Sequence, residues 1–423
     1  IDEAHRIKNE NAQFSKTVRL LHTRHRLLIT GTPLQNNLHE LWALLNFLLP
    51  DVFSSSEQFD EWFNLDIDDR EAKQRMIGQL HKLLRPFMLR RLKVDVEKSL
   101  PPKTETILYI GMSTVQKKLY KDLLTRDRDL VLNTTAGGSR TAILNIVMQM
   151  RKCCNHPYLN RGVEDLILHE IPIEKQTPTN LHMQMVNSAG KMVLLDKLLP
   201  KLQSQGHKVL IFSQMVRVLD LLEDYIRHRG YLFERLDGSS RSTDRASGVL
   251  RFNRPSCKRF IMLLSTRAGG LGLNLTAADT VIIYDSDWNP HNDIQAQARA
   301  HRIGQTRAVM VYRLITKKTY EMHMFHRASL KLGLDRAVLA HARNEKEEEE
   351  KVEGVIDKPV QSNKFDLQAK EIDELLKRGA YDVFREDDAE VKAFVEADID
   401  SILKRSARKV TYNAQESGGG SSF

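Results

Sequence analysis

The stretch KVLIFSQMVRVLDLLEDYIRHRGYLFERL, residues 208–236, alternates between two kinds of pattern. Val209–Phe212 is a short, fully apolar run, which is typical of a buried strand. Residues 216–228 then repeat apolar side chains at helical spacing, and Phe233–Leu236 is predicted to be the next strand. A strand, a helix and a strand in this order predict a right-handed crossover between parallel strands.

The same alternation of apolar strands and amphipathic helices extends from about residue 190 to about residue 335. Further strands are predicted at Phe260–Leu264, Val281–Tyr284 and Val309–Ile315, and further helices at 243–252, 291–301 and 319–331. Strands that alternate with helices predict a parallel sheet covered on both faces, so this region is assigned to the α/β class. In such sheets, ligands bind beyond the carboxyl ends of the strands.

The regions on either side of this sheet have other patterns. Leu27–Thr30 is expected to be a buried strand that Gly31 ends, and Leu38–Leu49 has helical periodicity. Residues 366–378 and 396–406 are predicted to be helical. The chain is therefore expected to comprise four regions: 1–105, a mostly helical 106–190, the sheet region 191–340, and an acidic, mainly helical extension 341–423.

Composition limits the classes of protein to consider. The 423 residues are 41% hydrophobic and 28% charged, which is enough apolar material for sizeable cores. No apolar stretch approaches the roughly 20 residues of a membrane span. Three cysteines cannot form a disulfide framework, which fits a reducing compartment.

Charge is unevenly distributed along the chain. Residues 341–423 contain 14 Lys/Arg and 20 Asp/Glu, a net charge of −6, and the whole chain carries +9, which leaves +15 on residues 1–340. A basic body is compatible with a polyanionic partner for which an acidic tail could compete, and equally with an ordinary solvated surface.

Two short motifs in the first region have coherent chemistry. In Asp2-Glu3-Ala4-His5, an aspartate could hold Mg²⁺ on a nucleotide while the neighbouring glutamate orients or deprotonates water. Four letters alone also occur by coincidence. Gly31-Thr32-Pro33 follows a predicted strand, and it equally fits a plain helix N-terminus with proline in the first turn.

Two longer motifs follow in the sheet region. Ser265–Leu275 places three glycines directly after a predicted strand, where they allow close approach to phosphate or ribose, or simply form a tight turn. In Gln295–Gln305, Arg299 and Arg302 lie three residues apart on one face of the predicted helix, so both guanidinium groups could reach one phosphate. A surface helix with ion pairs is the other interpretation.

In this order, the four segments resemble motifs II, III, V and VI of the superfamily-two helicase-like ATPases. Further segments resemble the chromatin-remodelling Swi/Snf-related family across essentially the whole chain: Ile1–Lys8, Thr30–Asn37, Leu38–Phe53, Leu84–Lys103, Arg151–Pro157, Val209–Met215 and Tyr284–Pro290. The first lobe is most similar to the imitation-switch branch. Ala328–Asp335 is more similar to the chromodomain-helicase-DNA-binding (CHD) branch, which we favour.

The resemblance implies two RecA-like lobes, the first of them incomplete, and ATP and Mg²⁺ as cofactors. It implies that Asp2 binds Mg²⁺, that Glu3 activates water, and that Arg299 and Arg302 are arginine fingers. Further residues are implied at the ATP site (Gly31, Gly270, Gly272 and Gln295) and at the DNA (Ser213, Gln214, Thr266, Arg267 and Trp288). The implied partners are duplex DNA, nucleosomes with their histones, and other subunits of a remodelling complex, in the nucleus.

One element of the family pattern is absent from the sequence. The chain starts at motif II, and Gly190-Lys191 does not replace the phosphate-binding Gly-Lys-Thr loop because Met192 stands at the Ser/Thr position. We therefore expect this piece alone not to hydrolyse ATP. Two other functions stay open: a strand-separating nucleic-acid helicase, which the insertion between the lobes argues against, and a non-catalytic chromatin-binding module.

Overall fold

The computed structural model describes most of the chain and divides it into two compact units. In their described residues, one unit comprises residues 1–91 with Ala328 and Ser329, and the other comprises residues 92–327 with the part of the extension from residue 394 to residue 412. The described residues are 1–31, 38–63, 70–89, 91, 96–97, 99–133, 140–266, 272–329, 394, 396–405 and 407–412. None of the helices within these ranges is long and apolar enough to cross a membrane.

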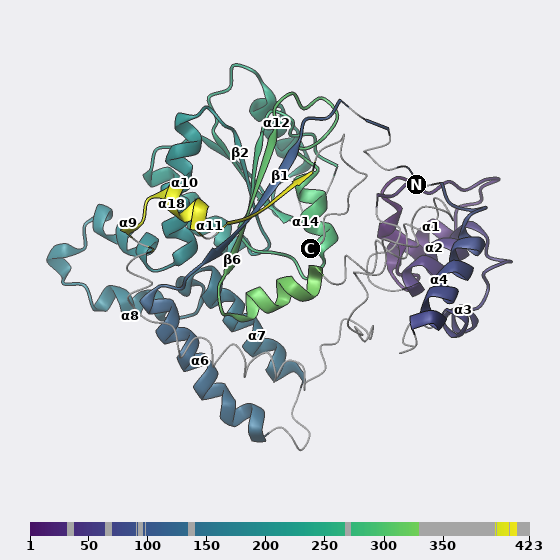
Figure 1. Ribbon diagram of the computed structural model, residues 1–423, viewed down its shortest axis with the longest axis horizontal. Helices are drawn as coiled ribbons and strands as arrows, with labels where there is room; N and C mark the ends of the chain where they lie inside the picture. The colour runs from purple at the N-terminus through teal and green to yellow at the C-terminus, as the bar shows by residue number, and fades with distance from the viewer. Residues whose placement is uncertain are drawn as a thin grey trace. The chain divides into compact units, whose positions relative to one another are not determined.

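A seven-stranded sheet forms the centre of the second unit, in the order β3-β4-β2-β5-β6-β1-β7 (Figure 1). All neighbouring strands are parallel except β7, which runs antiparallel to β1. The strands are β1 (Lys103–Ile110), β2 (Val209–Ser213), β3 (Phe233–Leu236), β4 (Ile261–Ser265), β5 (Thr280–Ile283), β6 (Val309–Thr316) and β7 (Ala407–Tyr412).

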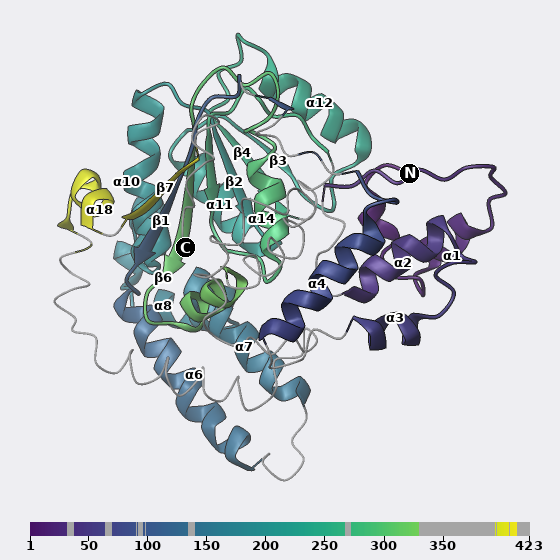
Figure 2. The same cartoon turned by 45° about the vertical axis from the view of Figure 1, so that its right-hand side comes forward.

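Helices cover both faces of this sheet. In Figure 2, α10 lies to the left of the strands and α12 to the right. Alternate residues of β2 pack into the two cores: Ile211 lies with residues of α10 and α11, and Phe212 with residues of α12 and α14. The helices are α6 (Thr114–Asn133), α7 (Arg140–Asn155), α8 (Val163–His169), α9 (Pro178–Asn187), α10 (Gly190–Ser204), α11 (Val216–His228), α12 (Ser242–Asn253), α14 (Pro290–Gln297) and α18 (Ile399–Arg405), with short 3-10 turns η2 (Pro157–Leu159) and η3 (Ile173–Lys175).

The predicted parallel α/β sheet is confirmed, and the strand predictions agree with the structure to within about one residue. Residues 320–329 are helical, as predicted from the pattern over 319–331. The expected boundary at residue 105 falls inside β1, whose eight residues pair with β6. β1 hydrogen-bonds within this sheet, and the second unit begins before it, at Leu92.

The regular elements among the described residues of the first unit are helices. It contains η1 (Ala4–Ile7), α1 (Gln13–Arg19), α2 (Leu38–Leu48), α3 (Ser56–Trp62) and α4 (Arg70–Leu84). The predicted helix at 38–49 is thus confirmed as α2, whose Leu41, Trp42 and Leu45 lie in the unit's core.

The buried strand expected at Leu27–Thr30 is not present. The segment is extended, but Leu27 is 71% and Ile29 is 56% exposed. Its backbone bonds run to residues 1–4 on one side, with the N–H of Ile29 donating to the carbonyl of Ile1 at 2.9 Å. An apolar run predicts burial only when other elements cover it, and the described residues of this unit leave these two side chains open.

Part of the acidic extension packs on the second unit. Ile399 and Ile402 of α18 are buried in the core that α10 borders. Lys197 of α10 donates to the carbonyl of Ala397 at 2.6 Å, and Lys201 forms an ion pair with Asp400. The helix predicted at 396–406 is confirmed as α18, and β7 after it pairs with β1.

Candidate functional site

The acidic pair at the start of the first unit has an unusual backbone. Asp2 is exposed, and its Oδ1 atom accepts a hydrogen bond from the N–H of Glu3 at 2.8 Å. Glu3 has φ 50° and ψ 48°, in the left-handed region, where a side chain other than glycine costs about 1–3 kcal/mol. Strain of this kind concentrates at functional sites, and an exposed carboxylate is a suitable oxygen ligand for Mg²⁺. The pair therefore fits the expected nucleotide–metal role.

His5 lies beside the expected base. Its Nδ1 atom is 3.3 Å from Oε2 of Glu3. Burial lowers the pKa of His5 more than the Glu3 carboxylate raises it, so the imidazole stays neutral at pH 7. Gly31, the other expected ATP-site residue of this unit, is exposed, and a Cβ atom added there would meet no atom within 4 Å. Its backbone is therefore accessible to a ligand.

Two motifs meet in the second unit: the glycine-rich loop, residues 265–275, and the arginine segment, residues 299–302. The NH1 atom of Arg302 donates to the carbonyl of Gly272 at 3.2 Å. The N–H of Leu275 donates to the carbonyl of Arg299 at 3.1 Å. Gly272 has φ 67°, a conformation that favours glycine. The structure thus joins two motifs that the sequence analysis had identified separately, whereas Arg267 and Gly270 of the same loop lie outside the described residues.

The arginines do not share a helix face, and that expectation is wrong. The helix predicted at 291–301 ends at Gln297, so Arg299 and Arg302 lie in the turns that follow it. Beyond Gln297 the N–H groups of Arg299 and Ala300 donate to carbonyls three residues earlier, those of Ala296 and Gln297, as in a tight turn. Arg299 is 7% exposed and Arg302 is exposed. Only Arg302 therefore presents its guanidinium to solvent.

The carboxyl ends of β2 and β5 meet at Asp285. Its Oδ1 atom accepts from the hydroxyl of Ser213 at 2.6 Å and from the N–H of Gln214 at 3.1 Å. On its other side, Arg151 of α7 donates to Oδ2 at 3.3 Å and to the carbonyl of Ser286 at 2.8 Å. Ser213 is fully buried, so its hydroxyl orients the turn. The half-buried Gln214 has a covered side-chain nitrogen without a hydrogen-bond partner.

Of the remaining expected residues of this unit, Thr266 and Trp288 follow the carboxyl ends of β4 and β5. Thr266 is buried and directly follows β4. Trp288 is half-buried, and its ring centroid lies 5.7 Å from that of Tyr320. Gln295 is half-buried on α14. Since the carboxyl ends of parallel strands meet at one edge, Ser213 and Thr266 lie where α/β sheets bind their ligands.

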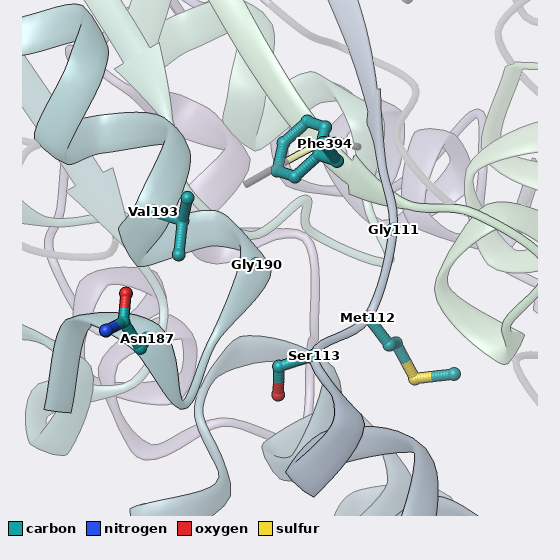
Figure 3. Close-up of a pocket in the computed structure, with 7 residues that line it drawn as sticks. All are labelled: Gly111, Met112, Ser113, Asn187, Gly190, Val193 and Phe394. Atoms are coloured by element: carbon teal, nitrogen blue, oxygen red, sulfur yellow. The ribbon is translucent and has the colours of Figure 1, made fainter. Parts of the chain in front are cut away.

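The Gly190-Lys191 pair has a structural role. A Cβ atom on Gly190 would lie 2.1 Å from the carbonyl oxygen of Gly111, so only glycine fits there. Figure 3 shows the two glycines at a small hollow that Phe394 also lines. The Nζ atom of Lys191 is buried and bonds to the carbonyl of Tyr284 at 2.8 Å and to Glu321 at 2.5 Å. This lysine is therefore engaged inside the core.

A buried charged group centred on Arg313 was not predicted from the sequence. Arg313 donates to Oε1 of Glu105 at 2.9 Å and to Oδ2 of Asp293 at 2.5 Å, and all three side chains are buried. Burial raises the pKa of Glu105, but the charges of Arg313 and Lys103 outweigh it and leave that pKa lowered. Burial raises the pKa of Asp293 to about 7 although Arg313 opposes the shift. A charged residue inside a predicted buried strand was the available signal.

Two family models match the chain. The SNF2-related domain matches residues 1–159, and the helicase conserved C-terminal domain matches residues 190–304. The first match extends beyond the first unit and includes β1 and α7, which the structure places in the second unit. Together the two matches include the acidic pair, Asp2 and Glu3, and the arginine segment, residues 299–302.

Curated proteins from plants and animals are similar to the chain. It is 57% identical, over 81% of its length, to 31% of the "ISWI chromatin-remodeling complex ATPase CHR11" of Arabidopsis thaliana. Over its whole length it is 49% identical to 14% of the "Chromodomain-helicase-DNA-binding protein 9" of Homo sapiens, and 50% identical to 16% of the "Chromodomain-helicase-DNA-binding protein 8" of Rattus norvegicus. The chain spans less than a third of the length of these relatives. With both domain models matched in the expected order, the chain belongs to the SNF2-related family of helicase-like proteins.

Proposed function

We propose that the chain is part of an ATP-dependent chromatin remodeller that moves along duplex DNA and repositions nucleosomes in the nucleus. The observation that carries the proposal is the contact between the glycine-rich loop and the arginine segment, through Arg302 and Gly272. It lies in a unit whose relatives are named as chromatin-remodelling ATPases. Because the CHD-type relatives match the chain over its full length, we favour that branch.

The chain's own residues have distinct proposed tasks. Asp2 holds Mg²⁺ and Glu3 orients or deprotonates water at the first unit. Arg302, which is exposed, stabilises the charge that develops on a transferred phosphoryl group, and Arg299 supports it from a buried position. ATP with Mg²⁺ supplies the phosphoryl group. Gly31, Gly270, Gly272 and Gln295 complete the nucleotide site.

The DNA contact is proposed for the carboxyl edge of the sheet. The DNA backbone is contacted directly by Gln214 and by the half-buried Trp288. The side-chain nitrogen of Gln214 has no hydrogen-bond partner in the described structure. Ser213 and Thr266 are buried and shape the turns that present them. Arg267, which lies outside the described residues, adds positive charge to the same loop. Nucleosomes, their histones and other complex subunits are the proposed partners of the whole protein.

The test is ATP hydrolysis by the full-length protein with and without duplex DNA and nucleosomes. We expect stimulation by both, little sequence preference, and DNA binding that weakens with salt at a slope of about −0.9 per neutralised phosphate. Displacement of one strand of a duplex would show a strand-separating helicase instead. Nucleosome binding without hydrolysis would show a non-catalytic module.

A further inference from the structure

The segment that carries the arginines is held by the strand that opens the second unit. Gln297, the last residue of α14, lies two residues before Arg299 and is 2% exposed. Its Oε1 atom accepts from Nζ of Lys103 at 2.9 Å, and its Nε2 atom donates to Oε1 of Glu105 at 3.2 Å. Both partners belong to β1, about 190 residues away along the chain.

A second contact holds the turn between the two arginines. The Nε2 atom of His301 lies 2.9 Å from the carbonyl oxygen of Pro101, two residues before β1 begins. A carbonyl oxygen only accepts, so Nε2 of His301 carries the hydrogen and donates it. One short stretch, residues 101–105, thus restrains the arginine segment at two points: before it, at Gln297, and within it, at His301.

The other end of α14 is restrained by the same stretch through Arg313. Asp293, in the first turn of α14, bonds to Arg313 at 2.5 Å, and Arg313 bonds in turn to Glu105 at 2.9 Å. Glu105 therefore accepts hydrogen bonds both from Gln297 and from the arginine that fixes Asp293. Buried networks in which every member has a partner rigidify the elements that they join.

We propose that Lys103, Glu105 and Gln297 are positioning residues that set the arginine segment 299–302 for phosphoryl transfer. The stretch 101–105 follows the residues at which the chain passes from the first unit to the second. The inference rests on the proposed ATPase function.

The test compares variants of the full-length protein in nucleosome-stimulated ATP hydrolysis. Gln297→Met keeps the volume of the side chain and removes both hydrogen bonds, and Lys103→Met removes one of them. We expect kcat to fall by about 10- to 100-fold, since misplacing catalytic groups by about 1 Å has effects of that size, while KM for ATP changes less than about threefold. The double variant should be no worse than Gln297→Met, because the two changes break one shared contact.

Tyr225→Phe is the matched control. It removes a hydrogen bond of 2.9 Å to Asp196 in the same unit, and Tyr225 of α11 belongs to a different hydrophobic core from Ala300. It should lower stability without changing kcat. Hydrogen exchange of the peptide 295–305 is the second measurement, and it should be faster in Gln297→Met and unchanged in Tyr225→Phe.

Three outcomes separate the possibilities. An unchanged kcat and unchanged exchange in Gln297→Met would overturn the inference, as would an equal loss of kcat in Tyr225→Phe. If the wild-type protein shows no DNA-stimulated hydrolysis, the proposed function fails. In that case faster exchange at 295–305 in Gln297→Met still establishes that β1 restrains the arginine segment.

Discussion

The Ser213 hydroxyl donates to the Asp285 carboxylate at 2.6 Å, which ties the carboxyl end of β2 to that of β5. Asp285 is 1% exposed and also forms an ion pair with Arg151 of α7. Helix α7 is thereby anchored to the edge of the sheet that is proposed to contact DNA. Changes at Asp285 should therefore affect stability and DNA binding together.

We predict that Asp285→Asn lowers the free energy of unfolding by about 3–5 kcal/mol, because it leaves the charge of Arg151 buried and uncompensated. Ser213→Ala removes the bond to Asp285 and the bond that the hydroxyl oxygen accepts from the N–H of Met215, and at about 1 kcal/mol for each bond it should cost about 2 kcal/mol. Urea unfolding of both variants, followed by duplex DNA titration below the transition, is the measurement. Equal losses in the two variants would contradict a buried ion pair at this position.

Arg302→Ala should reduce ATP turnover by about 10³–10⁵-fold and leave DNA affinity within about threefold of wild type. Its side chain is exposed, so the change should not alter thermal stability. Arg299 is buried, and Arg299→Lys is the better test there because it keeps the charge while losing the planar fork. Steady-state hydrolysis with saturating nucleosomes measures both. A loss of only a few-fold at Arg302 would place it among ordinary surface residues.

Glu3→Gln should abolish turnover and retain ATP binding, because the amide keeps the shape of the side chain and cannot accept a proton. The left-handed backbone of Glu3 makes Glu3→Gly the matched control, since glycine relieves the strain and loses the side chain. Nucleotide binding and single-turnover hydrolysis should be compared in the full-length protein. Normal hydrolysis in Glu3→Gln would remove this residue from the mechanism.

His156 should make stability fall in mild acid. It is buried, Nε2 lies 3.0 Å from the carbonyl oxygen of Met185, and Nδ1 accepts from the N–H of Tyr158. Burial lowers its pKa to about 4 from the usual 6.5. Between pH 6.5 and pH 4, the unfolded chain therefore binds a proton at His156 and the folded chain does not. About 3 kcal/mol of stability is lost as pH falls through this range.

The check is denaturant unfolding of wild type and His156→Gln across this pH range. The glutamine can make both hydrogen bonds and does not titrate, so the stability of the wild type relative to this variant should fall by about 3 kcal/mol between pH 6.5 and pH 4. The other titratable groups are the same in both proteins, so their contributions to stability cancel in the comparison. A constant difference would mean that His156 has an ordinary pKa in the folded state.

Deleting residues 341–423 from the full-length protein, with later domains kept on a neutral linker, should raise basal hydrolysis or uncouple it from nucleosome sliding. The segment that contains α18 and β7 contacts α10 and β1, and a segment that favours one arrangement of the lobes biases their equilibrium. A deletion that retains residues 394–412 is the control. Unchanged hydrolysis and sliding in both deletions would leave the extension as a tether.

Much of the second unit could be predicted because parallel strands are buried on both faces. Val209–Phe212 and Val281–Tyr284 are apolar at every position, a local signal that needs no knowledge of neighbours. The end of α14 was not predictable in this way, because the residue pattern of 295–301 does not show that the backbone bonds change from helix to turn after Gln297. The Glu105–Arg313 contact joins residues 208 positions apart, and nothing in the local pattern of either strand specifies its partner.

The antiparallel pairing of β7 with β1 also bears on solubility. Without β7, the eight-residue β1, which contains the run Ile107–Ile110, would present one row of unpaired backbone groups at the border of the sheet. Exposed edges of this kind recruit strands from other molecules and seed aggregates. The opposite border is β3, only four residues long, where Glu234 and Arg235 are engaged in ion pairs. Truncations that end before Ala407 are therefore expected to yield protein that self-associates, and those that extend through Tyr412 to yield monomer.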